Sequence, residues 1–174
     1  MSTERSSVPA ALAAIVAIVA IVAIALSTAC STAPEPEPPR DEAASQALLA
    51  GTAWRLTAYR SGDRSVYLDR AAMDAAGDGD AFSLAFDGGR VGGLASCNRY
   101  FGEAAWDGPG GLSITGLAST KMACLDEPYG LSEYDFFVAL SVATGWDLAN
   151  GSLMLGGRAA DGSSVELAFS SPGR

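Results

Sequence analysis

The sequence predicts a mainly β (α+β) fold: a compact antiparallel β-sheet or barrel-like roll packed on one α-helix. Short runs of apolar and β-branched residues recur from residue 52 onward, and Gly and Asp separate them. One segment after residue 130 instead repeats its apolar residues every three or four positions. Because short strands joined by tight turns pair with their neighbours, this rhythm favours an antiparallel sheet.

Strands are expected in the segments that carry the short apolar runs. These are Thr52–Tyr59, Phe82–Phe86, Val91–Leu94, Tyr100–Trp106, Leu112–Leu117, Trp146–Ala149, Ser152–Leu155 and Val165–Phe169. Asp87–Arg90 and Asn150-Gly151 predict hairpin turns, since their glycines adopt the positive φ that tight turns need. The Asp107–Gly111 loop contains Pro109, which cannot donate to a central ladder, so we expect this loop at a sheet edge.

A single amphipathic helix is expected over Leu131–Val142. Its predicted apolar stripe consists of Leu131, Tyr134, Phe137, Val138 and Val142. Ser132 is the predicted N-cap, and the acidic side chains of Glu133 and Asp135 suit the first turn of a helix. We expect the stripe to pack against the sheet.

The N-terminal segment predicts export and a membrane anchor. Val8–Leu26 carries no charge and is long enough to cross a bilayer as a helix. The next residues, Leu26-Ser27-Thr28-Ala29-Cys30, resemble the lipobox of bacterial lipoproteins, although Ser27 stands where that pattern has Leu. Residues 1–29 are therefore either a lipoprotein-type signal peptide, with Cys30 lipidated, or an N-terminal membrane helix. Both alternatives place the remaining chain outside the cytoplasm, anchored to the membrane.

Residues 30–46 are rich in Pro and Glu, a composition that favours an extended tether over a packed core. Residues 47–174 then have an ordinary length for one domain.

Charge and composition exclude several classes of function. The chain has 20 acidic and 11 basic residues, a net charge of −9 that disfavours nucleic acid as a partner. It has no histidine, which removes Ser-His-Asp and Cys-His nucleophiles and most catalytic zinc sites. Lys121 is the single lysine, and Ala118 stands where an S-x-x-K motif needs serine. We assign no catalytic residue, no cofactor and no metal.

Cys97 and Cys124 lie on either side of a predicted hairpin, in a chain expected to reach an oxidising compartment. We expect them to form a disulfide. The alternative is a metal or redox site, but the chain has no C-x-x-C motif, no histidine and no third cysteine in this domain.

Three segments resemble the META domain family of HslJ-type heat-shock proteins and secreted lipoproteins. They are Trp54-Arg55-Leu56, Gly93–Gly102 with its Cys97-Asn98 pair, and Ser119–Cys124. The resemblance covers about residues 51–170. It implies a β-rich domain with one helix, often exported and lipid-anchored and linked to stress tolerance, envelope integrity or virulence. It implies no catalytic mechanism.

The family's recurrent residues carry over to this chain as Cys97, Asn98, Gly102, Thr120, Met122 and Cys124. The structural interpretation is that Asn98 and Thr120 bond to backbone in turns, that Met122 fills core, and that Gly102 permits close strand approach. The sharper alternative is a binding surface that consists of Asn98, Arg99 and Lys121, beside the disulfide.

These observations favour a non-enzymatic protein of the cell envelope that contributes to envelope stability or to the stress response, or that acts as an interaction module. We expect it to bind an envelope protein or a small ligand. A carboxylate-dependent hydrolase of the cell envelope is the alternative from another class, because acids can act without histidine. Its candidate acids are Asp74, Asp78, Asp80, Asp126 and Glu127. Asp78-Gly79-Asp80 also suggests calcium, but the EF-hand spacing is absent.

Overall fold

The computed structural model describes residues 47, 49–124 and 129–171. The strands are β1 (Ala53–Ser61), β2 (Arg64–Tyr67), β3 (Ser83–Asp87), β4 (Arg90–Leu94), β5 (Arg99–Ala105), β6 (Ser113–Ser119), β7 (Ala143–Ala149), β8 (Ser152–Arg158) and β9 (Ser164–Ser170). The helices with defined bounds are α3 (Arg70–Ala76) and α4 (Glu133–Ser141).

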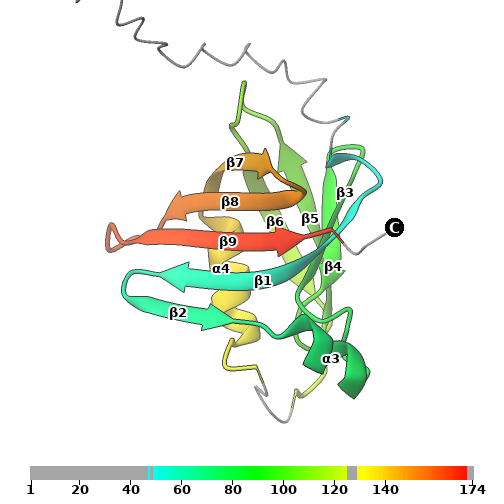
Figure 1. Ribbon diagram of the computed structural model, residues 1–174. Coiled ribbons are helices and arrows are strands. Elements are labelled where there is room, and N and C mark those ends of the chain that lie inside the picture. Colours follow the sequence, from blue (N-terminus) through cyan, green and yellow to red (C-terminus); the bar gives the residue numbers. More distant parts are fainter. Residues whose placement is uncertain (1–46, 48, 125–128, 172–174) are drawn as a thin grey trace, which may run out of the picture. The chain divides into compact units, whose positions relative to one another are not determined.

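The strands form one antiparallel sheet with the order β6-β5-β4-β3-β1-β9-β8-β7, and β2 pairs with β1 beside this path. The sheet curls around α4 as a half-barrel (Figure 1). Its two end strands approach each other near one end, where Trp146 N donates to Gly110 O at 2.9 Å and Leu112 N donates to Thr144 O at 3.2 Å. The predicted barrel-like roll is confirmed, and the loop that contains Pro109 lies at the sheet edge as expected.

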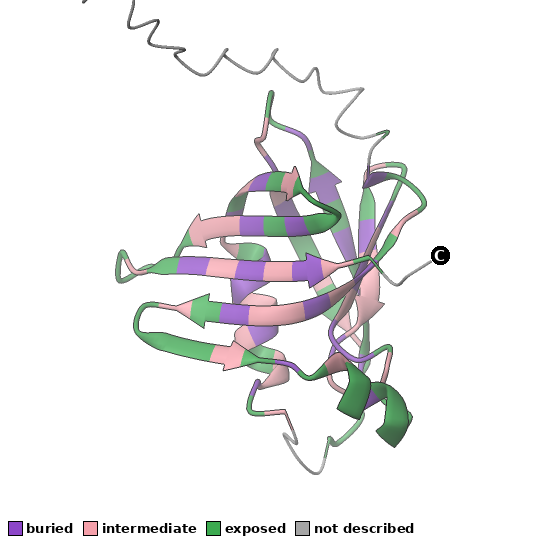
Figure 2. Cartoon of the chain, viewed as in Figure 1, coloured by how far each residue is buried: buried purple, intermediate pink, exposed green. Residues whose placement is uncertain are grey.

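Tight turns set the register of the hairpins. Gly88 and Gly89 have φ of 52° and 82°, and Asn150 and Gly151 have φ of 52° and 76°, as two-residue hairpin turns of the primed type require. Side chains then alternate along each strand, which Figure 2 shows as alternating buried and exposed bands. In β5 the residues at 100, 102, 104 are buried and those at 99, 101, 103 are exposed.

Helix α4 packs inside the curl, and Ser132 caps it by accepting a bond from Asp135 N at 3.0 Å. The predicted stripe is partly right: Leu131 is buried and Phe137 and Val142 pack against the core, but Tyr134 is 75% exposed and the buried residues of the helix itself are Phe136, Ala139 and Leu140. The Phe136 ring contacts Phe82 and Tyr100 edge to face, with centroids 5.4 and 5.8 Å apart. The helix is apolar on more than one side, so spacing alone does not select the buried face.

Strand β2 and helix α3 are absent from the sequence-based expectations. Strand β2 is mostly exposed and shows no apolar alternation. Helix α3 begins at the N-cap Asp69, which accepts from Ala72 N at 3.1 Å, and ends at Gly77 with φ of 87°. Its one buried residue is Met73, so the segment has no apolar stripe to detect.

No helix within the described residues is long and apolar enough to cross a membrane. The predicted signal peptide or membrane helix at 1–29, the tether at 30–46 and the lipidation site Cys30 all lie outside the described residues. These three assignments stay predictions.

Candidate functional site

The motif residues converge on Asn98, which lies between β4 and β5. Among the described residues it is the one polar residue that is buried, with 3% of its surface exposed. Burial of an amide is costly unless its donors and acceptors are bonded. The buried side-chain amide of Asn98 therefore needs hydrogen-bond partners from other parts of the fold.

The Asn98 side chain joins three segments. Its Oδ1 accepts from Thr120 Oγ1 at 2.8 Å and from Met122 N at 2.7 Å, while its Nδ2 donates to Met122 O at 3.1 Å and to Glu133 Oε1 at 2.9 Å. Thr120 Oγ1 in turn accepts from Arg99 N at 3.2 Å. The β4–β5 connection is thereby tied to the segment after β6 and to the first residue of α4.

These contacts correct two of the expectations. Asn98 is buried and its side-chain amide is bonded within the fold, so it does not lie on an exposed binding surface; Asn98 and Thr120 do bond to backbone, but that backbone belongs to Met122 and Arg99 in other segments and not to the same turn. Met122 does not fill core, because its side chain is 62% exposed and its backbone makes the contacts with Asn98. Gly102 does permit a close approach: a Cβ there would lie 2.9 Å from the carbonyl oxygen of Thr115.

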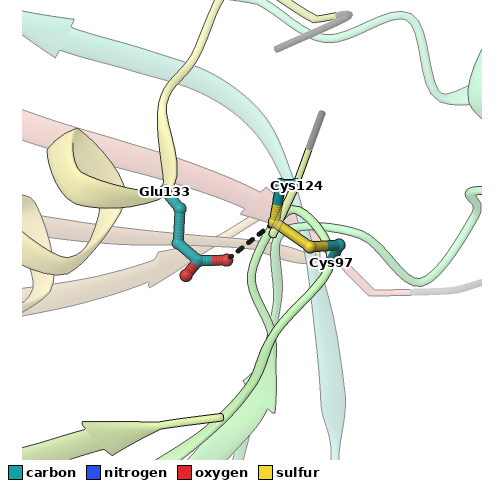
Figure 3. Close-up of side chains that lie close together, drawn as sticks. All are labelled: Cys97, Cys124 and Glu133. Carbon is teal, nitrogen blue, oxygen red and sulfur yellow. Dashed lines mark hydrogen bonds between the residues drawn. A yellow bond between two sulfur atoms is a disulfide. The ribbon is translucent and has the colours of Figure 1, made fainter. Parts of the chain in front are cut away.

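Cys97 and Cys124 form the predicted disulfide, with Cα atoms 5.9 Å apart. Cys124 is exposed and Cys97 is half-buried. Figure 3 shows the Glu133 carboxylate beside this bond, with Oε2 3.8 Å from the Cys124 sulfur. A disulfide sulfur has no proton to donate, so this is a close contact between an anionic oxygen and sulfur. Asn98 Nδ2 lies 3.4 Å from Cys124 Sγ and 3.7 Å from Cys97 Sγ.

Arg99 and Lys121, the other two residues of the predicted binding surface, are both exposed. Arg99 projects from the same face of β5 as Phe101 and Glu103, because alternate residues share a face. An open cleft of about 390 Å³ lies on this face. It is lined by Arg90, Phe101, Gly102, Glu103 and Gly116. Phe101, which is one of these lining residues, is 67% exposed.

Two of the candidate acids make internal contacts. Asp74 forms an ion pair with Arg55 at 2.6 Å, and Asp78 accepts a bond from the Tyr129 hydroxyl at 2.6 Å. The bond to Asp78 raises the pKa of Tyr129 above its usual value. Asp126 and Glu127 lie outside the described residues.

Among the described residues, the group close enough to share a metal ion is Cys97, Cys124 and Glu133, with ligand atoms within 4.8 Å of one another. This group does not include the acids of Asp74–Asp80, so the geometry gives the calcium hypothesis no support.

Sequence reasoning missed Glu133 and Phe101 as site residues. Glu133 reaches the disulfide only because α4 packs inside the sheet, and the sequence carries no signal for that contact. Phe101 was detectable, since an inward Tyr100 on an alternating strand places its neighbour outward.

Residues 46–170 match the family model of the META domain. The chain belongs to the META domain family. An NMR structure of a protein from Burkholderia xenovorans resembles this chain with a TM-score of 0.54 and 24% identity, over 82% of this chain and 98% of that one. A crystal structure of a DUF4847-family protein from Bacteroides vulgatus has a TM-score of 0.45 and 17% identity, over 71% of this chain and 96% of that one. The former likeness supports the fold of this META domain. The search of curated proteins gave no match.

Proposed function

We propose that this META-domain protein is a non-enzymatic envelope lipoprotein that acts by binding an envelope protein or a small ligand. The observation that carries the proposal is the cleft on the outer face of β4, β5 and β6. Phe101 is largely exposed there, beside Arg90 and Glu103, which are cross-strand partners of opposite charge. An exposed aromatic side chain flanked by oriented polar groups is typical of a surface that another molecule covers.

The cleft lies near Arg99 and Lys121, the two exposed residues of the predicted binding surface. Arg99 follows the same strand face, and Lys121 comes directly after Thr120, whose hydroxyl bonds to the backbone of Arg99. Arg90 and Arg99 place two basic side chains on this face, beside the acidic Glu103, in a chain whose net charge is −9. This local excess of basic side chains favours anionic partners over cationic ones.

Membrane anchoring and an extracytoplasmic location are supported by the uncharged Val8–Leu26 segment and the lipobox-like residues up to Cys30. A disulfide in the folded domain agrees with an oxidising compartment. A binding role without catalysis is supported by the absence of histidine in the sequence and by the partners of Asp74 and Asp78.

The cleft is tested by site-specific photo-crosslinking in intact cells. A benzophenone amino acid replaces Phe101 in one strain and Tyr67 in the control strain; Tyr67 is 77% exposed on β2, away from the cleft strands. We expect adducts of defined mass at position 101 and not at 67. Equal labelling at the two positions, or none at 101, would contradict the proposed binding face.

Catalysis is tested separately by replacing each candidate acid with its amide and measuring a phenotype that depends on the protein. The changes are Asp74→Asn, Asp78→Asn, Asp80→Asn, Asp126→Asn and Glu127→Gln. The proposal expects each variant to retain the phenotype while it stays folded and abundant. Loss of the phenotype in one such variant would favour the carboxylate-dependent hydrolase.

A further inference from the structure

We propose that Cys97, Cys124 and Glu133 form a redox-gated site for a borderline-soft divalent cation such as Zn²⁺. The site is closed while the two cysteines are joined. It forms when a dithiol reductant opens the disulfide, and it then offers two sulfur ligands and one carboxylate oxygen.

The distances suit such a site. In a tetrahedral zinc centre with ordinary bond lengths, a thiolate and a carboxylate oxygen lie about 3.6 Å apart. Glu133 Oε2 already lies 3.8 Å from Cys124 Sγ, and the ligand atoms of all three residues fall within 4.8 Å of one another. Once the bond is broken, the two sulfurs need to separate to about 3.8 Å, which rotation of the side chains can supply. A water molecule completes four ligands.

Asn98 positions the carboxylate. Its buried Nδ2 holds Glu133 Oε1 at 2.9 Å, and its backbone N donates to Oε2 at 3.3 Å, so the carboxylate stays beside the sulfurs. The same Nδ2 lies within 3.7 Å of both sulfurs. The N–H groups that Asn98 donates to the two carboxylate oxygens are the kind of outer support that holds a metal ligand in place and tunes the affinity.

Charge explains the gating. Within the described residues no ion pair involves Glu133, so its carboxylate lacks a cationic partner. In the oxidised chain the disulfide adds no charge, and one carboxylate alone holds a divalent cation weakly. In the reduced chain two thiols join it, and because they lose their protons as a cation binds, the cation then holds three adjacent anionic ligands that would otherwise repel one another.

A dithiol can reduce the disulfide between Cys97 and Cys124 in two exchange steps. A thiolate of the dithiol attacks the exposed Cys124 sulfur, and Cys97 leaves as a thiolate that takes up a proton. The second thiol of the reductant then resolves the mixed disulfide, which releases Cys124 and leaves the reductant oxidised. The cation displaces one proton from each thiol as it binds, so affinity rises with pH.

The test uses the full-length chain in detergent, with Cys30→Ser throughout so that only two thiols remain. A phosphine reduces the disulfide without adding a competing thiol. Zn²⁺ affinity is measured by competition with a chromophoric chelator, and Cd²⁺ reports sulfur ligands through its ultraviolet charge-transfer band. We expect one ion per reduced chain, a sulfur-to-cadmium band, and no binding to the oxidised chain.

The matched variants are Glu133→Gln, which removes the anionic oxygen, and Glu103→Gln, an exposed carboxylate on β5. We expect Glu133→Gln to lower Zn²⁺ affinity at least about tenfold and Glu103→Gln to leave it unchanged. Equal affinity in the two variants, or no binding by the reduced chain, would overturn the proposal. If reduction unfolds the domain, Zn²⁺ should restore its circular dichroism in the parent but not in Glu133→Gln; failure to restore it counts against the site.

Discussion

The replacement Asn98→Ala should destabilise the domain strongly. It removes three neutral hydrogen bonds, with Thr120 Oγ1, Met122 N and Met122 O, and one bond to the Glu133 carboxylate. At about 1 kcal/mol for each neutral bond and about 2 kcal/mol for the charged one, the sum is about 5 kcal/mol. Thr120 and Met122 are exposed, so water replaces part of what they lose, and we expect about 3 kcal/mol.

The oxidised protein is unfolded with urea, which gives the free energy of unfolding, and by heat, which gives the Tm. Circular dichroism monitors both transitions. For a domain of this size, about 3 kcal/mol corresponds to a fall of roughly 10 °C in Tm. Thr115→Ala is the control, because Thr115 is exposed on β6 and its loss should change the free energy of unfolding by less than about 0.5 kcal/mol.

A double-mutant cycle with Glu133→Gln isolates the charged contact. We expect a coupling energy of about 1 kcal/mol or more between positions 98 and 133, because the two side chains are bonded directly. If Asn98→Ala costs less than about 1 kcal/mol, or if its effect adds to that of Glu133→Gln without coupling, then the hydrogen bonds of Asn98 do not stabilise the domain.

Three further predictions concern other parts of the chain. Reduction of the disulfide, whose cysteines are separated by 27 positions, should lower stability by about 3.5 kcal/mol in calorimetry, and an unchanged Tm would refute this. Gly157→Ala should lower Tm, since the added Cβ would overlap the Val142 carbonyl. Gly156→Ala is the control and should have little effect, because a Cβ added there would meet no atom within 4 Å. Equal shifts in Tm for the two variants would contradict the packing. Mass spectrometry of the membrane fraction should find a mature chain that begins at an acylated Cys30, whereas a start near Met1 would indicate a retained helix.

Local signals predicted much of the sheet. The Asn150-Gly151 turn and the alternation in β5 depend only on neighbouring residues, so the sequence locates them without knowledge of the rest of the fold. Strand β2 and helix α3 were not predicted, because each buries too little apolar surface to leave a periodic pattern in the sequence. For α4, Phe136 and Phe137 both satisfy helical spacing, and only the position of the sheet decides which of them is buried.

The site was less accessible to prediction. The sequence indicated that Cys97 and Asn98 matter together with Thr120 and Cys124, since these residues form the recurrent motif. It did not indicate that Asn98 is buried, because its burial results from three segments that meet only in the folded chain. Glu133 belonged to a predicted helix N-terminus, where an acid is expected for the helix dipole alone.

The pairing of β1 with β9 has a consequence for how the chain folds. Strand β1 lies between β3 and β9, so the first strand of the domain is joined to the last, in a register that pairs Arg55 with Ser170. Contacts between residues so far apart in sequence slow folding, because the loop entropy is lost before the pairing is gained. During synthesis, β1 and β8 therefore each keep one exposed edge until β9 has been made. Any arrest before β9 leaves one open edge on each of these two strands, and such edges favour aggregation or proteolysis.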